Sequence, residues 1–296
     1  MAGALRVTTR NARFQQWAAL LSNRAKRQRS GEFLVQGVRP VTMAIRHGWP
    51  VRALLYDDRA VLSGWARELL GSCPAPQFAV SPELLRELGG KAETAPELLA
   101  VAGLPPDDLS RLPVHPAMLT VVFDRPASPG NVGSLIRSAD ALSASGVIVT
   151  GHAADIYDPQ AVRASTGSLF SVPAVRVPSH RDVLGWLAGV RAGGLDARLA
   201  GTDESGTRDL ARYDFTRPVV VVIGNETSGL SAAWREACDD MIRIPMSGSA
   251  SSLNAAAAAS IVLYEAARQR AWPDPAQPSA DHAGTGIPPV GAGGDF

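Results

Sequence analysis

The sequence has few of the residues and segments that mark secreted, metal-binding or membrane proteins. Its 296 residues include only two cysteines, Cys73 and Cys238, which lie far apart and outside any CxxC pattern. This argues against a disulfide framework and against a zinc site. No apolar run approaches the roughly 18 residues that a membrane helix needs. No segment near the N-terminus joins a basic region to an apolar core and a cleavage site, so we expect a cytoplasmic protein without a membrane partner.

Motifs of several common enzyme classes are also missing. There is no GxxxxGK[ST] phosphate loop, no GxGxxG after the first strand of a βαβ unit, no HExxH and no GxSxG. The five histidines show no metal-ligand spacing. We therefore expect no bound metal, and no chemistry of the P-loop, dinucleotide-binding, zinc-protease or serine-hydrolase type.

Basic residues gather at the start of the chain. Residues 1–31 hold seven of the 29 lysines and arginines and no acidic residue, which leaves 22 basic against 28 acidic groups in the remainder. We expect residues 1–30 to form a basic helix or arm, which would suit the phosphates of a nucleic acid. A solvated helix face or a disordered leader is the alternative interpretation.

The order of apolar runs and helical patterns predicts an α/β protein with two domains. Residues 31–104 alternate strands and helices and form a small first domain. Proline-rich residues 105–116 are the predicted linker. Residues 117–271 form the second domain, and residues 272–296, rich in proline and glycine, are a predicted disordered tail.

The second domain has the pattern of a mostly parallel sheet covered by helices on both faces. Its apolar runs contain or begin at Leu119, Gly146, Pro173, Ala197, Pro218 and Met241. The last helix should begin near Ser252 or Leu253 and end near Arg270. Its alanines favour helix and close packing against a neighbour, including a dimer partner.

Three polar loops follow predicted strands, at the edge where open α/β sheets bind ligands. In the first, NVGSLIR, a helix should open near Asn131, with Arg137 about two turns later. A helix N-terminus and an arginine suit a phosphate. The alternative is that Asn131 only caps the helix and Arg137 is a surface residue.

The second and third loops are GNETSGLS, from Gly224 to Ser231, and IPMSGSASSLN, from Ile244 to Asn254. In the second, Asn225 or Glu226 either holds polar ligand atoms or ties neighbouring loops together. Small residues in both loops let backbone groups approach a ligand closely.

In this order and spacing, NVGSLIR, GNETSGL and IPMSGSASSLN resemble the three motifs of the SpoU-like (TrmH) branch of the SPOUT RNA methyltransferases. The segment SGEFLVQGVRPVTMAI also resembles the substrate-binding domain, similar to ribosomal protein L30e, that often precedes the catalytic domain in that family. The resemblance implies 2′-O-methylation of a ribose in RNA, with S-adenosyl-L-methionine as methyl donor. It also implies a homodimer and a trefoil knot in the catalytic domain.

Matching the motifs residue by residue gives two sets of site residues. The donor pocket implied by the resemblance consists of Thr202, Gly224, Ile244, Met246 and Leu253. The implied catalytic residues are Asn131, Arg137, Glu226, Ser252 and Asn254. The family's usual general base matches Arg137, but a guanidinium with a pKa above about 12 is a poor base at neutral pH. We therefore favour a phosphate contact and orientation of the hydroxyl as the role of Arg137.

The resemblance favours 23S ribosomal RNA as substrate over tRNA. The first domain is similar to that of ribosomal-RNA members of the family, including resistance enzymes of the avilamycin and thiostrepton type. A tRNA 2′-O-methyltransferase and a non-catalytic RNA-binding or ribosome assembly factor are the alternatives. The chain departs from the family's pattern after Asn254, where five alanines follow.

Overall fold

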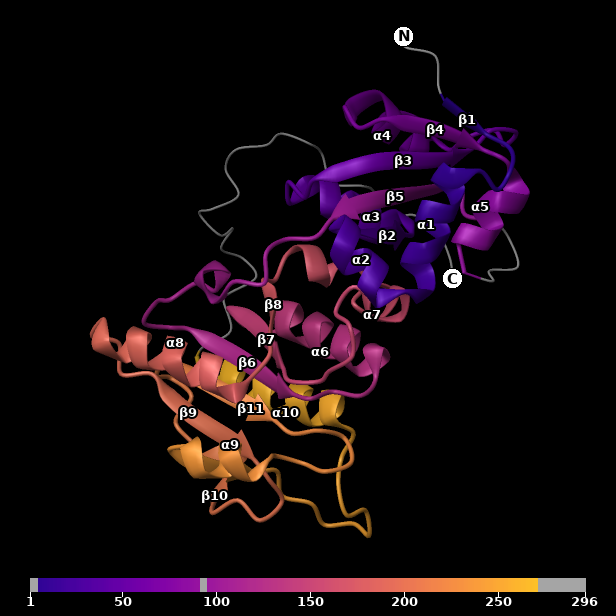
Figure 1. Ribbon diagram of the computed structural model, residues 1–296. Helices are drawn as coiled ribbons and strands as arrows, with labels where there is room; N and C mark the ends of the chain where they lie inside the picture. The colour runs from indigo at the N-terminus through magenta and orange to yellow at the C-terminus, as the bar shows by residue number, and fades with distance from the viewer. Residues whose placement is uncertain (1–4, 91–94, 271–296) are drawn as a thin grey trace.

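The computed structural model describes residues 5–90 and 95–270, which form two sheets with their covering helices (Figure 1). The tail predicted for residues 272–296 lies outside the described residues. Below, the N-terminal unit means residues 5–90 and 95–103, and the C-terminal unit means residues 117–270. No helix in the described ranges is both long and apolar enough to cross a membrane.

The N-terminal unit is a five-stranded sheet of order β1-β4-β3-β5-β2, in which β5 is antiparallel to both its neighbours. Its elements are β1 (Leu5–Val7), α1 (Ala12–Ser22), α2 (Arg24–Ser30), β2 (Glu32–Gln36), α3 (Val38–Arg46), β3 (Val51–Asp57), α4 (Gly64–Ser72), β4 (Gln77–Val80), α5 (Pro82–Leu88) and β5 (Leu98–Gly103).

The basic start of the chain, expected as one helix or arm, contains the short strand β1 and two helices, α1 and α2. The break falls at Asn23, whose side chain accepts a hydrogen bond from the backbone N–H of Lys26 and so caps α2. Apolar side chains of α1 are buried in a core shared with β3, β4 and β5, namely Phe14, Trp17 and Leu20. The two helices are therefore packed onto the sheet, with most of their cations exposed.

The C-terminal unit is a seven-stranded sheet of order β10-β12-β9-β11-β6-β7-β8, and all its pairings are parallel. The prediction of a mostly parallel sheet is confirmed. From the connecting segment onward the elements are η1 (Leu109–Arg111), β6 (Leu119–Asp124), α6 (Pro129–Ala141), β7 (Gly146–Thr150), α7 (Pro159–Ala164), η2 (Ser168–Phe170), β8 (Ala174–Val177), α8 (His180–Ala192), β9 (Arg198–Thr202), β10 (Arg208–Asp209), η3 (Leu210–Arg212), β11 (Val219–Ile223), α9 (Ala232–Ala237), β12 (Asp240–Arg243) and α10 (Ala255–Gln269).

Both faces of this sheet are buried, which explains the unbroken apolar runs. Val121 of β6 packs into a core with residues of α6 and α10, whereas Val122 packs with residues of α8 and α9. The strand order sets β11 between β6 and β9, with Phe123 opposite Ile223 and Val222 opposite Gly201. The loops after these three strands therefore leave the sheet side by side.

Two helices begin at other residues than the sequence predicted. Helix α6 begins at Pro129 and is capped by Ser128, whose Oγ accepts from the N–H of Asn131 at 3.3 Å. Asn131 is thus not the cap, and its amide is available for other contacts. Helix α10 begins at Ala255, because Asn254 rather than a serine supplies the capping oxygen. The trefoil knot and the domain boundaries stay predictions.

Candidate active site

A cavity of about 390 Å³ lies at the carboxyl ends of β9, β11 and β12. It is closed on one side by the loop after β11 and on another by the segment that enters α10. The lining includes every residue of the predicted donor pocket, namely Thr202, Gly224, Ile244, Met246 and Leu253, together with Glu226 and Ser252 from the predicted catalytic set. This volume is in the range of small-molecule sites, which run from roughly 300 to 1,000 Å³.

The loop after β11 turns back on itself, and Gly224 is where it is tightest. A Cβ atom on Gly224 would lie 2.5 Å from the carbonyl carbon of Gly229 and 2.6 Å from the nitrogen of Leu230. Asn225 and Gly229 exchange two backbone hydrogen bonds of 3.0 Å, and Gly229 has a φ of 63°. Only glycine fits at position 224, and it leaves the backbone exposed to whatever fills the cavity.

The cavity wall combines apolar side chains with one ion pair. Met246 and Leu253 are 38% and 39% exposed, so both offer apolar surface beside the cavity. Arg235 donates to Asp203 at 2.8 Å, and both line the cavity. Burial opposes ionisation of Asp203, but hydrogen bonds from Ser205 and Arg235 outweigh it and hold the pKa of this carboxyl below its ordinary value. No local sequence pattern indicated this pair.

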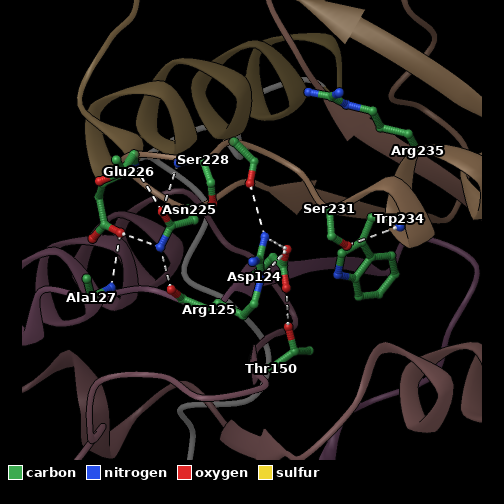
Figure 2. A network of polar contacts seen from close by, with 12 residues as sticks. Asp124, Arg125, Ala127, Thr150, Asn225, Glu226, Ser228, Ser231, Trp234 and Arg235 are labelled. Carbon is green, nitrogen blue, oxygen red and sulfur yellow. Dashed lines mark hydrogen bonds and ion pairs between the residues drawn. The ribbon is translucent and has the colours of Figure 1, made fainter.

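Glu226 is the centre of a hydrogen-bond network that joins the first two motif loops (Figure 2). Its carboxylate accepts from the backbone N–H of Ala127 at 3.0 Å and of Ser128 at 3.3 Å, and from the side-chain amide of Asn131 at 2.9 Å. Burial raises the pKa of Glu226, but these donors more than offset it, so the pKa lies below its ordinary value. Glu226 is therefore an ionised acceptor at neutral pH and has no proton to donate.

Asn131 also joins the first motif to the third. Its Oδ1 accepts from the Nδ2 of Asn254 at 3.1 Å, while the Oδ1 of Asn254 caps α10. The structure thus brings Asn131, Glu226 and Asn254 together beside the cavity. Ser252 lines the cavity nearby.

Arg137 lies apart from that group. It is exposed on α6, about two turns beyond Asn131, and forms no hydrogen bond or ion pair with another described residue. It is not among the cavity-lining residues. An exposed, unpaired guanidinium remains available to a phosphate from outside the chain.

Arg125 and Asn225, which belong to neither the predicted catalytic set nor the predicted donor pocket, hold the second loop in place. Arg125 has a left-handed backbone with φ of 50°, and its carbonyl accepts from the Nδ2 of Asn225 at 2.6 Å. Its guanidinium donates to Asp124 at 3.1 Å and to the carbonyl of Gly229 at 3.4 Å (Figure 2). Asn225 therefore ties the loops together, one of the two roles considered for it. An Arg-Pro pair directly after a buried strand that ends in Asp124 was the only signal for Arg125.

We predict that Glu226→Gln lowers the melting temperature at pH 7 by roughly 2–4 °C, allowing for solvent screening of a partly exposed carboxylate. The neutral amide of the introduced glutamine accepts hydrogen bonds more weakly than a carboxylate does. Its NH₂ group would also face the other donors that now point at Glu226. Because the folded-state pKa is depressed, this contribution is present above the ordinary pKa of 4.5 and is lost as the pH falls through the folded value. Thermal melts from pH 7 to pH 3.5 should therefore show the difference shrinking in acid. Glu204→Gln, an exposed cavity-lining residue, is the control, and an equal loss there would refute the prediction.

In the described part of the chain, no group of three or more histidine, cysteine, aspartate or glutamate residues is arranged to hold a metal ion. The polar groups of the site are amides, hydroxyls, the carboxylates of Glu204 and Glu226, and the Asp203–Arg235 pair. Apolar side chains beside many polar and charged groups suit an organic ligand that combines an apolar ring with polar atoms, such as a nucleoside.

Comparison with known families matches both units. The SpoU L30e-like domain matches residues 11–100, and the SpoU rRNA Methylase family matches residues 118–264. A 23S rRNA (uridine(2479)-2′-O)-methyltransferase from Streptomyces viridochromogenes is 62% identical over 267 residues, which cover 90% of this chain and 93% of that protein.

Solved structures give the same result. The crystal structure of the SpoU methyltransferase AviRb from Streptomyces viridochromogenes, in complex with the cofactor AdoMet, aligns with a TM-score of 0.86 at 62% identity. The alignment covers 88% of this chain and 98% of that one. An AdoMet-bound rRNA methyltransferase from Sinorhizobium meliloti aligns with a TM-score of 0.79 at 27% identity, over 90% and 98% of the two chains.

Proposed function

Because this chain belongs to the SpoU rRNA methylase family, we propose that it transfers a methyl group from S-adenosylmethionine to the 2′-hydroxyl of a ribose in 23S ribosomal RNA. The observation that carries this proposal is the meeting of Asn131, Glu226 and Asn254 beside a cavity whose tightest point is Gly224. The cavity fits the donor: Gly224 leaves backbone atoms bare, and Ile244, Met246 and Leu253 offer apolar walls to an adenine ring.

The chain's own residues have a modest chemical task. A sulfonium-bound methyl group is already activated, so alignment of the hydroxyl with the S–C bond supplies much of the rate. As the ribose oxygen forms its bond to carbon, the S–C bond breaks and the hydroxyl proton must leave. Glu226, whose carboxylate is occupied by four donors, acts by holding the Asn131 and Ala127 segments in place. Arg137 binds the neighbouring RNA phosphate and orients the hydroxyl, and the proton leaves to that phosphate or to water.

Methyl transfer is tested with purified protein and S-adenosylmethionine carrying a labelled methyl group. We expect incorporation into 23S rRNA but not into tRNA, and a primer-extension stop at the uridine named for the Streptomyces viridochromogenes relative. Labelled tRNA would support the tRNA alternative. Donor binding without transfer to any RNA would support the assembly-factor alternative and refute the proposal.

We also propose that the modification confers resistance to a ribosome-targeting antibiotic. Expression in a sensitive bacterium should raise the inhibitory concentration of avilamycin or thiostrepton, and a variant unable to bind the donor should not. Methylated ribosomes that stay sensitive to both drugs would refute this role without affecting the methyl-transfer assignment.

The enzyme is proposed to act as a homodimer in the cytoplasm. Supporting the dimer, apolar side chains lie exposed near the cavity and on α10, namely Met246, Leu253 and Ile261. The alanines of α10 divide between its faces: Ala256 and Ala259 are buried against the rest of the chain, and Ala257 is exposed. Light scattering coupled to gel filtration should give twice the mass of the chain, and Ile261→Glu should shift it toward the monomer.

We predict that Arg137→Lys lowers kcat/KM for rRNA by roughly tenfold while donor affinity is unchanged, because lysine cannot bind a phosphate through two parallel hydrogen bonds. Steady-state methylation and calorimetry with the donor measure the two quantities. Arg212→Lys, another exposed arginine of the same unit, is the control and should be neutral. Full turnover by the Arg137 variant would show that two-point binding by a guanidinium is not needed.

A further inference from the structure

Arg27 belongs to the basic start of the chain, yet it is 2% exposed and unavailable to RNA. Its Nε and Nη2 each lie 2.8 Å from Asp155 Oδ2, and Nη2 lies 3.6 Å from Asp158. Its Nη1 donates to the carbonyl of Leu20 at 2.7 Å, at the end of α1. A guanidinium of α2 is therefore fixed between the neighbouring helix α1 and two carboxylates of the C-terminal unit.

A cluster of aromatic rings also joins the two units. Phe33 and Trp49 come from the N-terminal unit, whereas Tyr157 and Phe170 come from the C-terminal unit. The ring centroids of Phe33 and Tyr157 are 4.9 Å apart, and those of Trp49 and Phe170 are 5.0 Å apart. The indole N–H of Trp49 donates to the carbonyl of Phe170 at 3.1 Å. The core continues without interruption from one unit to the other.

The segment on the C-terminal side of this contact, residues 153–171, here called the coupling segment, is packed tightly against α6. It includes α7, which lies between the two units in Figure 1. A Cβ on Gly133 of α6 would lie 2.3 Å from the carbonyl oxygen of Ala161, so the two helices approach at the limit that glycine allows. Ser171 also donates to Asp140, near the end of α6, at 2.8 Å. Asn131 stands on this same helix, two residues before Gly133.

We infer that Arg27 is a positioning residue for methyl transfer: through Asp155 and the coupling segment it fixes the N-terminal unit relative to α6, and so fixes where bound RNA meets Asn131. Units of one chain usually move relative to each other unless their interface is large and apolar. A buried ion pair adds little stability compared with apolar replacements, and its best-supported role is to specify one arrangement. This inference rests on the proposed function for its RNA part.

The test uses the full chain with Arg27→Met and Asp155→Asn together, so that neither charge stays buried alone and the acceptor for the N–H of Tyr157 is kept. We expect wild-type affinity for S-adenosylmethionine and for rRNA, with kcat on rRNA reduced at least tenfold because the ribose is misplaced. Arg27→Lys with native Asp155 should recover part of that loss. Arg29→Met, an exposed change on the same helix, should alter RNA affinity and its salt dependence but not kcat.

A second measurement does not depend on activity. Spin labels at Arg86→Cys in α5 and Arg181→Cys in α8, with Cys73 and Cys238 replaced by alanine, report the distance between the units. We expect one narrow distribution that broadens in the Arg27→Met, Asp155→Asn protein. An unchanged distribution, wild-type kcat, or a loss confined to RNA affinity would each overturn the inference. If the distribution broadens in the variant and the wild-type protein methylates no RNA at all, the proposed function is refuted and the positioning contact still stands.

Discussion

Gly224→Val is expected to weaken S-adenosylmethionine binding by roughly 100-fold or more and to abolish methyl transfer with it. Any Cβ at this position would stand 2.5 Å from the carbonyl carbon of Gly229 and 2.6 Å from the nitrogen of Leu230. Both atoms belong to backbone, so no side chain can swing away to make room. The loop that lines the cavity must therefore open, and the γ-methyl groups of valine need more room still.

Calorimetric titration with the donor measures this loss, and circular dichroism shows whether the sheet survives. Gly248→Ala is the matched control within the third motif, because a Cβ there meets nothing within 4 Å. Gly185→Ala on α8 is a second control in open space. If Gly224→Val bound the donor as tightly as the controls do, the donor could not lie in this cavity.

The regular part of the fold follows from local patterns in the sequence. Apolar runs broken by helical segments predicted the parallel sheet, and the rule that ligands meet such sheets at the carboxyl ends of strands placed the three loops together. The two-residue strand β10, Arg208–Asp209, escaped prediction because it has no apolar pattern and is defined only by its pairing with β12.

The site needed information that local patterns do not contain. The residues of the donor pocket came from the family resemblance, since spacing alone does not show that Thr202 and Leu253 face one cavity. Ser128 rather than Asn131 caps α6, because the chain had two suitable caps within four residues and only the tertiary contact with Glu226 selects between them. Counting charges along the sequence likewise grouped Arg27 with the cations expected to face RNA. Its carboxylate partner, Asp155, lies 128 positions further along the chain, where no local pattern reveals it.

Asn131→Asp is expected to lower kcat by roughly 100-fold at pH 8 without changing donor affinity. Asn131 donates to Glu226 and accepts from Asn254, so it needs one donor and one acceptor on the same side chain. Aspartate keeps the acceptor but sets a second carboxylate 2.9 Å from the first. The like charges repel, and the junction of the three motifs opens. The matched control is Ser134→Ala, an exposed change on the same helix.

The same geometry predicts how the loss is reversed. Two carboxylates this close share a raised apparent pKa, so acid restores a proton between them. The activity of the Asn131→Asp enzyme relative to wild type should therefore rise as the pH falls from 8 toward 6. Combining Asn131→Asp with Glu226→Gln exchanges donor and acceptor: the glutamine NH₂ can donate to the introduced aspartate, and its carbonyl can accept from Ala127. We expect this double variant to be more active than either single variant, at every pH in that range. If the double variant loses as much activity as the two single losses combined, the Asn131–Glu226 bond does not couple the two motifs. Each residue would then act on the substrate alone.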